Sequence, residues 1–208
     1  MKALIIVDMQ YDFLPGGSLA VNDGDKIIER INKLQEKYDV VVATQDWHPA
    51  NHKSFASQHT DKQPFDVIEL GGNRQVLWLD HCVQGTKGAE IHKDIKQNKI
   101  SAIIRKGMNP EVDSYSAFFD VNKKNPTGLN GFLKDHNVTS VYICGLAADY
   151  CVYYTAKDAL ALGYTTYILE GTTKAINQEL FDELKEDFIK KGAVSYTHLR
   201  AHETPEHL

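Results

Sequence analysis

Residues 3–8 read ALIIVD, an apolar run that stops at an acidic residue. Four later runs are similar: VVVAT at 40–44, AIIR at 102–105, SVYIC at 140–144 and TTYIL at 165–169. Short runs rich in Ile and Val favour strands. Strands that are continuously apolar are buried on both faces, which is typical of a parallel sheet covered by helices on each side.

Segments with helical periodicity alternate with these runs. The clearest covers residues 24–37, where the apolar residues share one face: Ile27, Ile28, Ile31 and Leu34. Further helices are expected at 89–96, 128–136, 150–162 and 178–190. No internal repeat or linker divides the chain. We therefore expect an α/β fold of one domain, a mostly parallel β-sheet flanked by helices on both faces in three Rossmann-like layers.

Composition narrows the classes of function. The chain of 208 residues is 42% hydrophobic and 25% charged, as in globular proteins, and its net charge of −5 gives no reason to expect a nucleic-acid partner. The apolar run at 3–7 is too short to span a membrane, and Asp8 ends it too early for a signal peptide. Three cysteines do not form a disulfide framework, which favours the cytoplasm. Composition does not indicate an oligomeric state.

The C-terminal stretch differs in kind from the rest. Residues 194–204 read VSYTHLRAHET, which resembles an in-frame translation of a common sequencing adapter. We therefore expect one folded domain over residues 1–192 and a non-native tail over residues 193–208. The histidines of this tail are left out of the site: His198, His202 and His207. A genuine polar tail is the alternative, and it would leave the site unchanged.

Two expected loops, 45–88 and 106–126, are far longer than ordinary connections. They are rich in aromatic residues, too rich for disordered segments, among them Trp47, Phe55, Trp78, Tyr115, Phe118 and Phe119. Long ordered loops in a compact domain usually carry function, so a site is expected there.

Chemically active side chains follow the expected strands. Asp8 follows the first strand, Asp46 and His48 the second, Lys106 the third and Cys151 the fourth. Ligands of an open parallel sheet bind beyond the carboxyl ends of its strands. The topology alone therefore predicts that an acid, a metal-binding pair, a cation and a thiol meet at one edge.

Cys151 is expected at the start of a helix, after the small-residue turn at 145–148. Unpaired amides and the helix dipole favour a thiolate there, and a neighbouring Lys106 would lower the thiol pKa further. Asp8 could accept the thiol proton and return it to a leaving amine. The alternative is a buried inert thiol, the usual fate of a free cysteine and the interpretation we give to Cys82 and Cys144.

Asp46 and His48 stand two residues apart, and His52 and His81 lie further along the same loop. One carboxylate with imidazoles suits Zn²⁺, Mn²⁺ or Fe²⁺ and leaves positions open for water or substrate. The alternative is a surface pair of no function. His81 and the surrounding aromatic residues favour the metal site.

Five stretches resemble the nicotinamidases of the isochorismatase-like hydrolase superfamily. They are ALIIVDMQYDFLPGGSLAV, TQDWHPANHKSFA, WLDHCVQGTKGAE, RKGMNPEVDSYSAF and ICGLAADYCV, in family order up to residue 192. The resemblance implies a catalytic triad of Asp8, Lys106 and Cys151. It implies one divalent metal, zinc first and manganese or iron next. The implied ligands are Asp46, His48 and His81, with His52 as second choice.

The same resemblance implies the binding of substrate. Phe13, Trp78 and Tyr115 match positions that sandwich a pyridine ring. The peptide between Leu146 and Ala147 matches a cis bond, with the amides of Ala147 and Cys151 as oxyanion hole. The implied reaction is hydrolysis of nicotinamide to nicotinate and ammonia through a thioester, in NAD salvage. The alternatives are hydrolysis of another small amide or carbamoyl compound, and a non-enzymatic metal-binding or redox-sensing protein.

Overall fold

The computed structural model describes residues 1–190 and 194–196. Six strands in this part of the chain form one sheet in the order β5-β2-β1-β6-β7-β8, and every adjacent pair is parallel. Their bounds are β1 Lys2–Val7, β2 Val40–Asp46, β5 Ala102–Lys106, β6 Ser140–Leu146, β7 Thr165–Lys174 and β8 Val194–Tyr196. The predicted parallel sheet is confirmed, and each of the five predicted strands is found.

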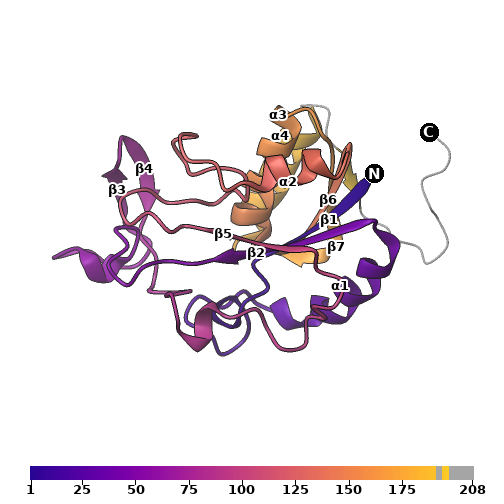
Figure 1. The fold of residues 1–208 in the computed structure, drawn as a ribbon. Coiled ribbons are helices and arrows are strands. Elements are labelled where there is room, and N and C mark those ends of the chain that lie inside the picture. The colour runs from indigo at the N-terminus through magenta and orange to yellow at the C-terminus, as the bar shows by residue number, and fades with distance from the viewer. Residues whose placement is uncertain (191–193, 197–208) are drawn as a thin grey trace.

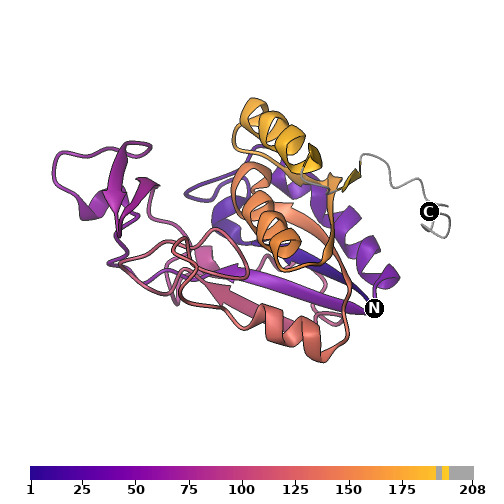
Figure 2. The same cartoon turned by 90° about the horizontal axis from the view of Figure 1, so that it is seen from above.

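Helices cover both faces of the sheet (Figures 1 and 2). Along β1, Ala3, Ile5 and Val7 point to one face and Leu4 and Ile6 to the other. The first face packs against α2 (Leu129–Asp135), α3 (Tyr153–Ala161) and α4 (Gln178–Lys190), and the second against α1 (Ile28–Leu34). Burying one such aliphatic side chain stabilises the fold by roughly 1.5–3 kcal/mol. The three-layer α/β architecture is therefore confirmed.

The predicted helices at 24–37 and 150–162 are each composite. The first is α1 with a 3₁₀ turn on either side, Gly24–Ile27 and Gln35–Lys37, and its predicted apolar face is buried. The second begins with one turn of π-helix, Ala148–Val152, before α3. π-Turns inside helices are rare and recur at functional sites, and this one carries Cys151.

The predicted helix at 89–96 is wrong. The structure has a 3₁₀ turn at Lys87–Ala89 followed by turns. Some backbone N–H groups of this segment bond to distant parts of the chain: that of His92 donates to the carbonyl of Met9, and that of Lys96 donates to the side chain of Asn32. These tertiary partners replace the hydrogen bonds of a helix.

The loop at 45–88 contains a hairpin that was not predicted. It consists of β3 (Val67–Leu70) and β4 (Asn73–Val76), paired antiparallel and extending away from the main sheet (Figure 1). Gly71 and Gly72, both with positive φ, form its turn. A Gly-Gly pair between two short runs is a recognised hairpin signal, so this element could have been found in the sequence.

Strand β8 falls inside the predicted tail of residues 193–208 and pairs with β7. The other residues of that tail lie outside the described part of the chain, so the boundary at 192 stays a prediction. Within the described residues, no helix has both the length and the apolar character needed to cross a membrane.

The strand order brings four strand ends together. At this edge Asp46 pairs in register with Lys106, and Val7 pairs with Gly145. Gly145 has φ +105, and a Cβ there would lie 2.1 Å from the carbonyl oxygen of Val7, so only glycine permits this approach. The turn that follows Gly145 therefore lies against Asp8.

Candidate active site

Lys106 is the centre of a buried polar cluster. Its Nζ lies 2.9 Å from Oδ2 of Asp8, 3.0 Å from Oδ1 of Asp46 and 3.4 Å from Sγ of Cys151. The ammonium also donates to the carbonyl of Ser114 at 3.2 Å. The side chains of Lys106 and Asp8 are 0% exposed. The structure thus brings together the carboxylate, the cation and the thiol that the strand ends predict.

Asp8 is held firmly by its neighbours. It has φ 46, a left-handed conformation in which aspartate is more common than most residues. Its N–H donates to Oγ1 of Thr44 at 3.0 Å, and the Thr44 hydroxyl donates back to Oδ1. Oδ2 is left to face Lys106. One oxygen of the carboxylate is therefore anchored and the other is turned to the cluster.

Burial and charge set the ionisation of this cluster. Burial raises the pKa of the Asp8 carboxyl above its usual range, although Lys106 opposes the shift. For Lys106, burial acts to lower the pKa, but the carboxylates of Asp46 and Asp8 outweigh it and hold the pKa well above normal. The cluster therefore contains a permanent cation beside a carboxyl that protonates readily.

Cys151 lies in the π-turn directly before α3, as the sequence predicts for a helix start. Burial raises the pKa of its thiol well above normal, and the lowering effect of Lys106 does not reverse this. Cys151 and Asp8 contact the same ammonium, that of Lys106, at 3.4 Å from the sulfur and 2.9 Å from the carboxylate. The predicted lowering of the thiol pKa is therefore not found, because desolvation outweighs the charge of Lys106.

A second group of side chains lies on the other side of Lys106. Oδ2 of Asp46 lies 3.0 Å from Nε2 of His48 and 3.5 Å from Nε2 of His81. The Nδ1 atoms face backbone carbonyls, of Gly107 at 2.9 Å for His48 and of Leu79 at 2.7 Å for His81. Each Nδ1 therefore carries the proton, and both Nε2 atoms present lone pairs.

These three ligand atoms fit a transition metal. Two imidazole nitrogens and a carboxylate oxygen converge at buried positions, a donor set that suits a divalent transition metal. Carbonyl oxygens that orient ligating imidazoles through Nδ1–H are the usual outer support of metal sites. The residues present therefore fit the implied metal.

His52 lies beside this group, with its ring 4.3 Å from that of His48. Burial lowers its pKa to about 4, so the ring is neutral. The Ser54 N–H donates to Nδ1 at 3.2 Å, which places the proton on Nε2, and Nε2 has no partner. His52, His48 and Asp113 also lie close enough to form a metal-binding group. A protonated Nε2 makes His52 a weaker candidate than the other three ligands.

A pocket opens above Cys151 and contains about 360 Å³ of space, part of it open to solvent. Phe13, Trp78 and Tyr115, the residues predicted to sandwich a ring, all line it. Asp46, His81, Ala147 and Cys151 line it as well. The peptide bond between Leu146 and Ala147 is cis, as predicted. One pocket is thus lined by the thiol, by two of the three candidate metal ligands and by the aromatic side chains.

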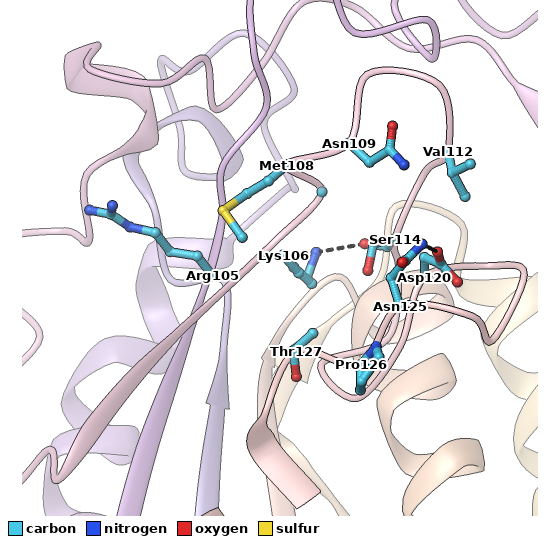
Figure 3. A pocket seen from close by; sticks show the side chains of 11 residues that line it. Arg105, Lys106, Met108, Asn109, Val112, Ser114, Asp120, Asn125, Pro126 and Thr127 are labelled. Carbon is cyan, nitrogen blue, oxygen red and sulfur yellow. Dashed lines mark hydrogen bonds between the residues drawn. The ribbon is translucent and has the colours of Figure 1, made fainter.

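A second pocket lies behind Lys106, with about 490 Å³ of space between residues 105–114 and 120–127. Figure 3 shows the ammonium of Lys106 reaching Ser114 at its wall. Neither Asp8 nor Cys151 lines this pocket, and no metal-ligand candidate does. We therefore place substrate chemistry in the pocket above Cys151.

Sequence reasoning missed four residues of that pocket: Leu19, Asp113, Tyr150 and Ile176. Tyr150 and Asp113 gave a usable signal, because they lie next to Cys151 and within the aromatic loop at 106–126. Leu19 and Ile176 gave no signal in the sequence. They are ordinary apolar residues in connecting segments, and only the folded chain brings them to the pocket.

Known proteins are similar to this chain in sequence and in fold. The sequence-family model described as the isochorismatase domain matches residues 2–198. A nicotinamidase of Acinetobacter baylyi is 50% identical over 175 residues, covering 84% of this chain and 82% of that protein.

Two solved structures are similar along nearly the whole chain. A yeast nicotinamidase bound to the inhibitor nicotinaldehyde is 35% identical, with a TM-score of 0.91 over 95% of this chain and 100% of that one. A pyrazinamidase of Pyrococcus horikoshii in complex with zinc is 39% identical, with a TM-score of 0.77 over 95% of this chain and 99% of that one.

Proposed function

Because the chain belongs to the isochorismatase family, we propose that it hydrolyses nicotinamide to nicotinate and ammonia, with Cys151 as nucleophile. The observation that carries the proposal is the position of the Lys106 ammonium, within 3.4 Å of both the Cys151 sulfur and the Asp8 carboxylate. Amide cleavage by a cysteine needs a thiol that the substrate can reach, which Cys151 supplies in the aromatic pocket, with a proton acceptor and a cation close to the sulfur.

In the proposed mechanism, Asp8 removes the proton from the Cys151 thiol as Sγ attacks the carboxamide carbon. The backbone amides of Ala147 and Cys151 donate to the oxyanion that forms. The C–N bond then breaks, and the proton on Asp8 passes to the departing nitrogen, which leaves as ammonia. A thioester between nicotinate and Cys151 remains.

The second half returns the enzyme to its starting state. Asp8 takes a proton from a water molecule as the hydroxide attacks the thioester carbonyl. The C–S bond breaks, nicotinate leaves, and the sulfur recovers its proton from Asp8. Lys106 stabilises the anionic sulfur in both halves, since its charge lies 3.4 Å from Sγ. It also keeps the Asp8 carboxylate in place.

Asp46, His48 and His81 would hold one divalent transition metal, with zinc first and manganese or iron next. Zinc is favoured by one carboxylate and two imidazoles, and by the zinc complex of the related Pyrococcus protein. Bound there, the metal would supply a Lewis-acid contact to the pyridine nitrogen. The aromatic side chains of Phe13, Trp78 and Tyr115 would bind the two faces of the ring.

The test is product analysis with purified protein. We expect ammonia and nicotinate in equal amounts from nicotinamide, loss of turnover with a chelator, and recovery with added zinc. Absence of both products from the zinc-loaded enzyme would refute the proposal. Small aliphatic amides and carbamoyl compounds form the comparison panel, because preference for one of them would favour the alternative hydrolase.

Nicotinate made in this way would enter pyridine nucleotide synthesis, that is NAD salvage. The free thiols of Cys82, Cys144 and Cys151 fit a reducing compartment such as the cytoplasm.

A further inference from the structure

Ile176 is the most exposed residue that lines the pocket above Cys151. It is 40% exposed. The other lining residues are buried or half-buried, so we infer that the pocket opens to solvent beside this side chain. Ile176 belongs to the segment between β7 and α4, which no part of the proposed reaction uses.

The backbone at Ile176 is fixed to the turn that carries the nucleophile. Oδ1 of Asp149 accepts the N–H of Ile176 at 3.0 Å, and Oδ2 accepts the N–H of Asn177 at 2.8 Å. Asp149 lies in the π-turn Ala148–Val152, two residues before Cys151. The carboxylate also lies at the N-terminal end of α4, where a negative charge is favourable. The position of Ile176 relative to Cys151 is therefore set by one side chain.

The orientation of the ring follows from the proposed function, on which this inference rests. The ring nitrogen N1 points to the Asp46 and His81 side, and the carboxamide on C3 points to Cys151. C2 lies between these two atoms and so faces the buried floor of the pocket. C5 is opposite C2 on the ring and faces the mouth, where Ile176 lies.

We propose that Ile176 determines which substituted pyridine carboxamides the enzyme accepts, by covering the C5 edge of the ring, and that Asp149 positions it for this task. Ile176 is then a specificity-determining residue and Asp149 a positioning residue. The substrate class in question is nicotinamides that carry a group on C5.

The experiment measures kcat/KM for nicotinamide, 5-methylnicotinamide and 2-methylnicotinamide with the wild type, Ile176→Ala and Ile189→Ala. Ile189 is a matched control, because it is also an exposed isoleucine, at 48%, but lies on α4 outside the pocket. Removing apolar bulk from a pocket changes selectivity by about tenfold or more. We therefore expect Ile176→Ala to raise the ratio for 5-methylnicotinamide over nicotinamide by about tenfold, and Ile189→Ala to leave it unchanged.

Binding provides a readout that does not depend on turnover. Calorimetry with nicotinate and 5-methylnicotinate should show the same change in the ratio of Kd values. The ratio of kcat/KM for 2-methylnicotinamide over nicotinamide should be unchanged in Ile176→Ala, because C2 faces the floor of the pocket. Ile176→Val provides a milder variant, with a smaller change in the same direction.

A double-mutant cycle tests Asp149. If it acts through Ile176, Asp149→Asn shifts the 5-methyl ratio in the wild type but adds nothing in the Ile176→Ala background. Additive shifts would overturn the role of Asp149.

Two results would overturn the role of Ile176: an unchanged 5-methyl ratio in Ile176→Ala, or an equal rise for 2-methylnicotinamide. Failure of the wild type to release ammonia from nicotinamide is a different result. It would refute the proposed function and this inference with it.

Discussion

The ammonium of Lys106 lies 3.0 Å from Oδ1 of Asp46, and Oδ2 of the same carboxylate faces His48 and His81. Asp46 therefore connects the metal-ligand set to the thiol side of the site through one shared cation. The metal-ligand side and the thiol side of the site therefore interact electrostatically. A change of charge on one side should alter the pKa values of the groups on the other.

Replacing Lys106 by methionine should destabilise the protein strongly. The carboxylates of Asp8 and Asp46 would remain buried without their cation, and breaking a buried pair in this way costs about 3–5 kcal/mol. Lys99→Met is the control, because Lys99 pairs with Glu36 at 3.0 Å on the surface, where a pair contributes about 0–1 kcal/mol. Urea unfolding of the metal-free proteins measures both. Equal losses would show that Lys106 is not a buried structural cation.

Zinc affinity should depend on the absence of a side chain at Gly107. A Cβ there would lie 2.4 Å from Cε1 of His48 and 2.9 Å from Oδ1 of Asp46. Gly107→Ala should therefore displace a ligand and lower zinc affinity. Gly72→Ala is a matched control: both glycines have positive φ, so both variants bear about 1–2 kcal/mol of backbone strain. Nothing lies within 4 Å of the Gly72 position. Equal zinc affinities in the two variants would contradict the prediction.

His48 and His52 should differ as metal ligands. His48→Ala should lose stoichiometric zinc, because Nε2 of His48 lies 3.0 Å from the Asp46 carboxylate. His52→Ala should keep its zinc, with affinity lowered by about tenfold, as expected for a group outside the ligand set. Metal analysis after dialysis measures both. Loss of zinc from His52→Ala would make His52 a ligand and displace our assignment.

Much of the site could be predicted because parallel strands deliver their ends to one edge. Asp8, Asp46 and Lys106 follow apolar runs that the sequence shows plainly, so their meeting required only the strand order. The helix at 89–96 was wrong because His92 and Lys96 donate to distant partners, which local periodicity does not reveal. The raised thiol pKa of Cys151 was not predicted, because desolvation depends on how the folded chain packs around the sulfur.

The pH dependence of stability should reveal Asp149. Burial raises the pKa of this carboxyl above 3.8, although the amides of Ile176 and Asn177 oppose the shift. A group with a raised folded pKa contributes stability below its unfolded pKa and loses it as the pH rises through the folded value. The free energy of unfolding of the wild type should therefore fall, relative to Asp149→Asn, as the pH rises from 3.8 through the raised value. Urea unfolding across this range measures it, and parallel profiles would contradict the shift.

The most direct test of the account is ammonia release from nicotinamide by Cys151→Ala loaded with zinc. Because the variant lacks the atom that attacks the carboxamide, we predict a fall in kcat of roughly 10⁴-fold or more, with zinc binding retained. Turnover within a factor of about ten of the wild type would contradict the account, because a reaction barrier so little changed does not involve the Cys151 sulfur.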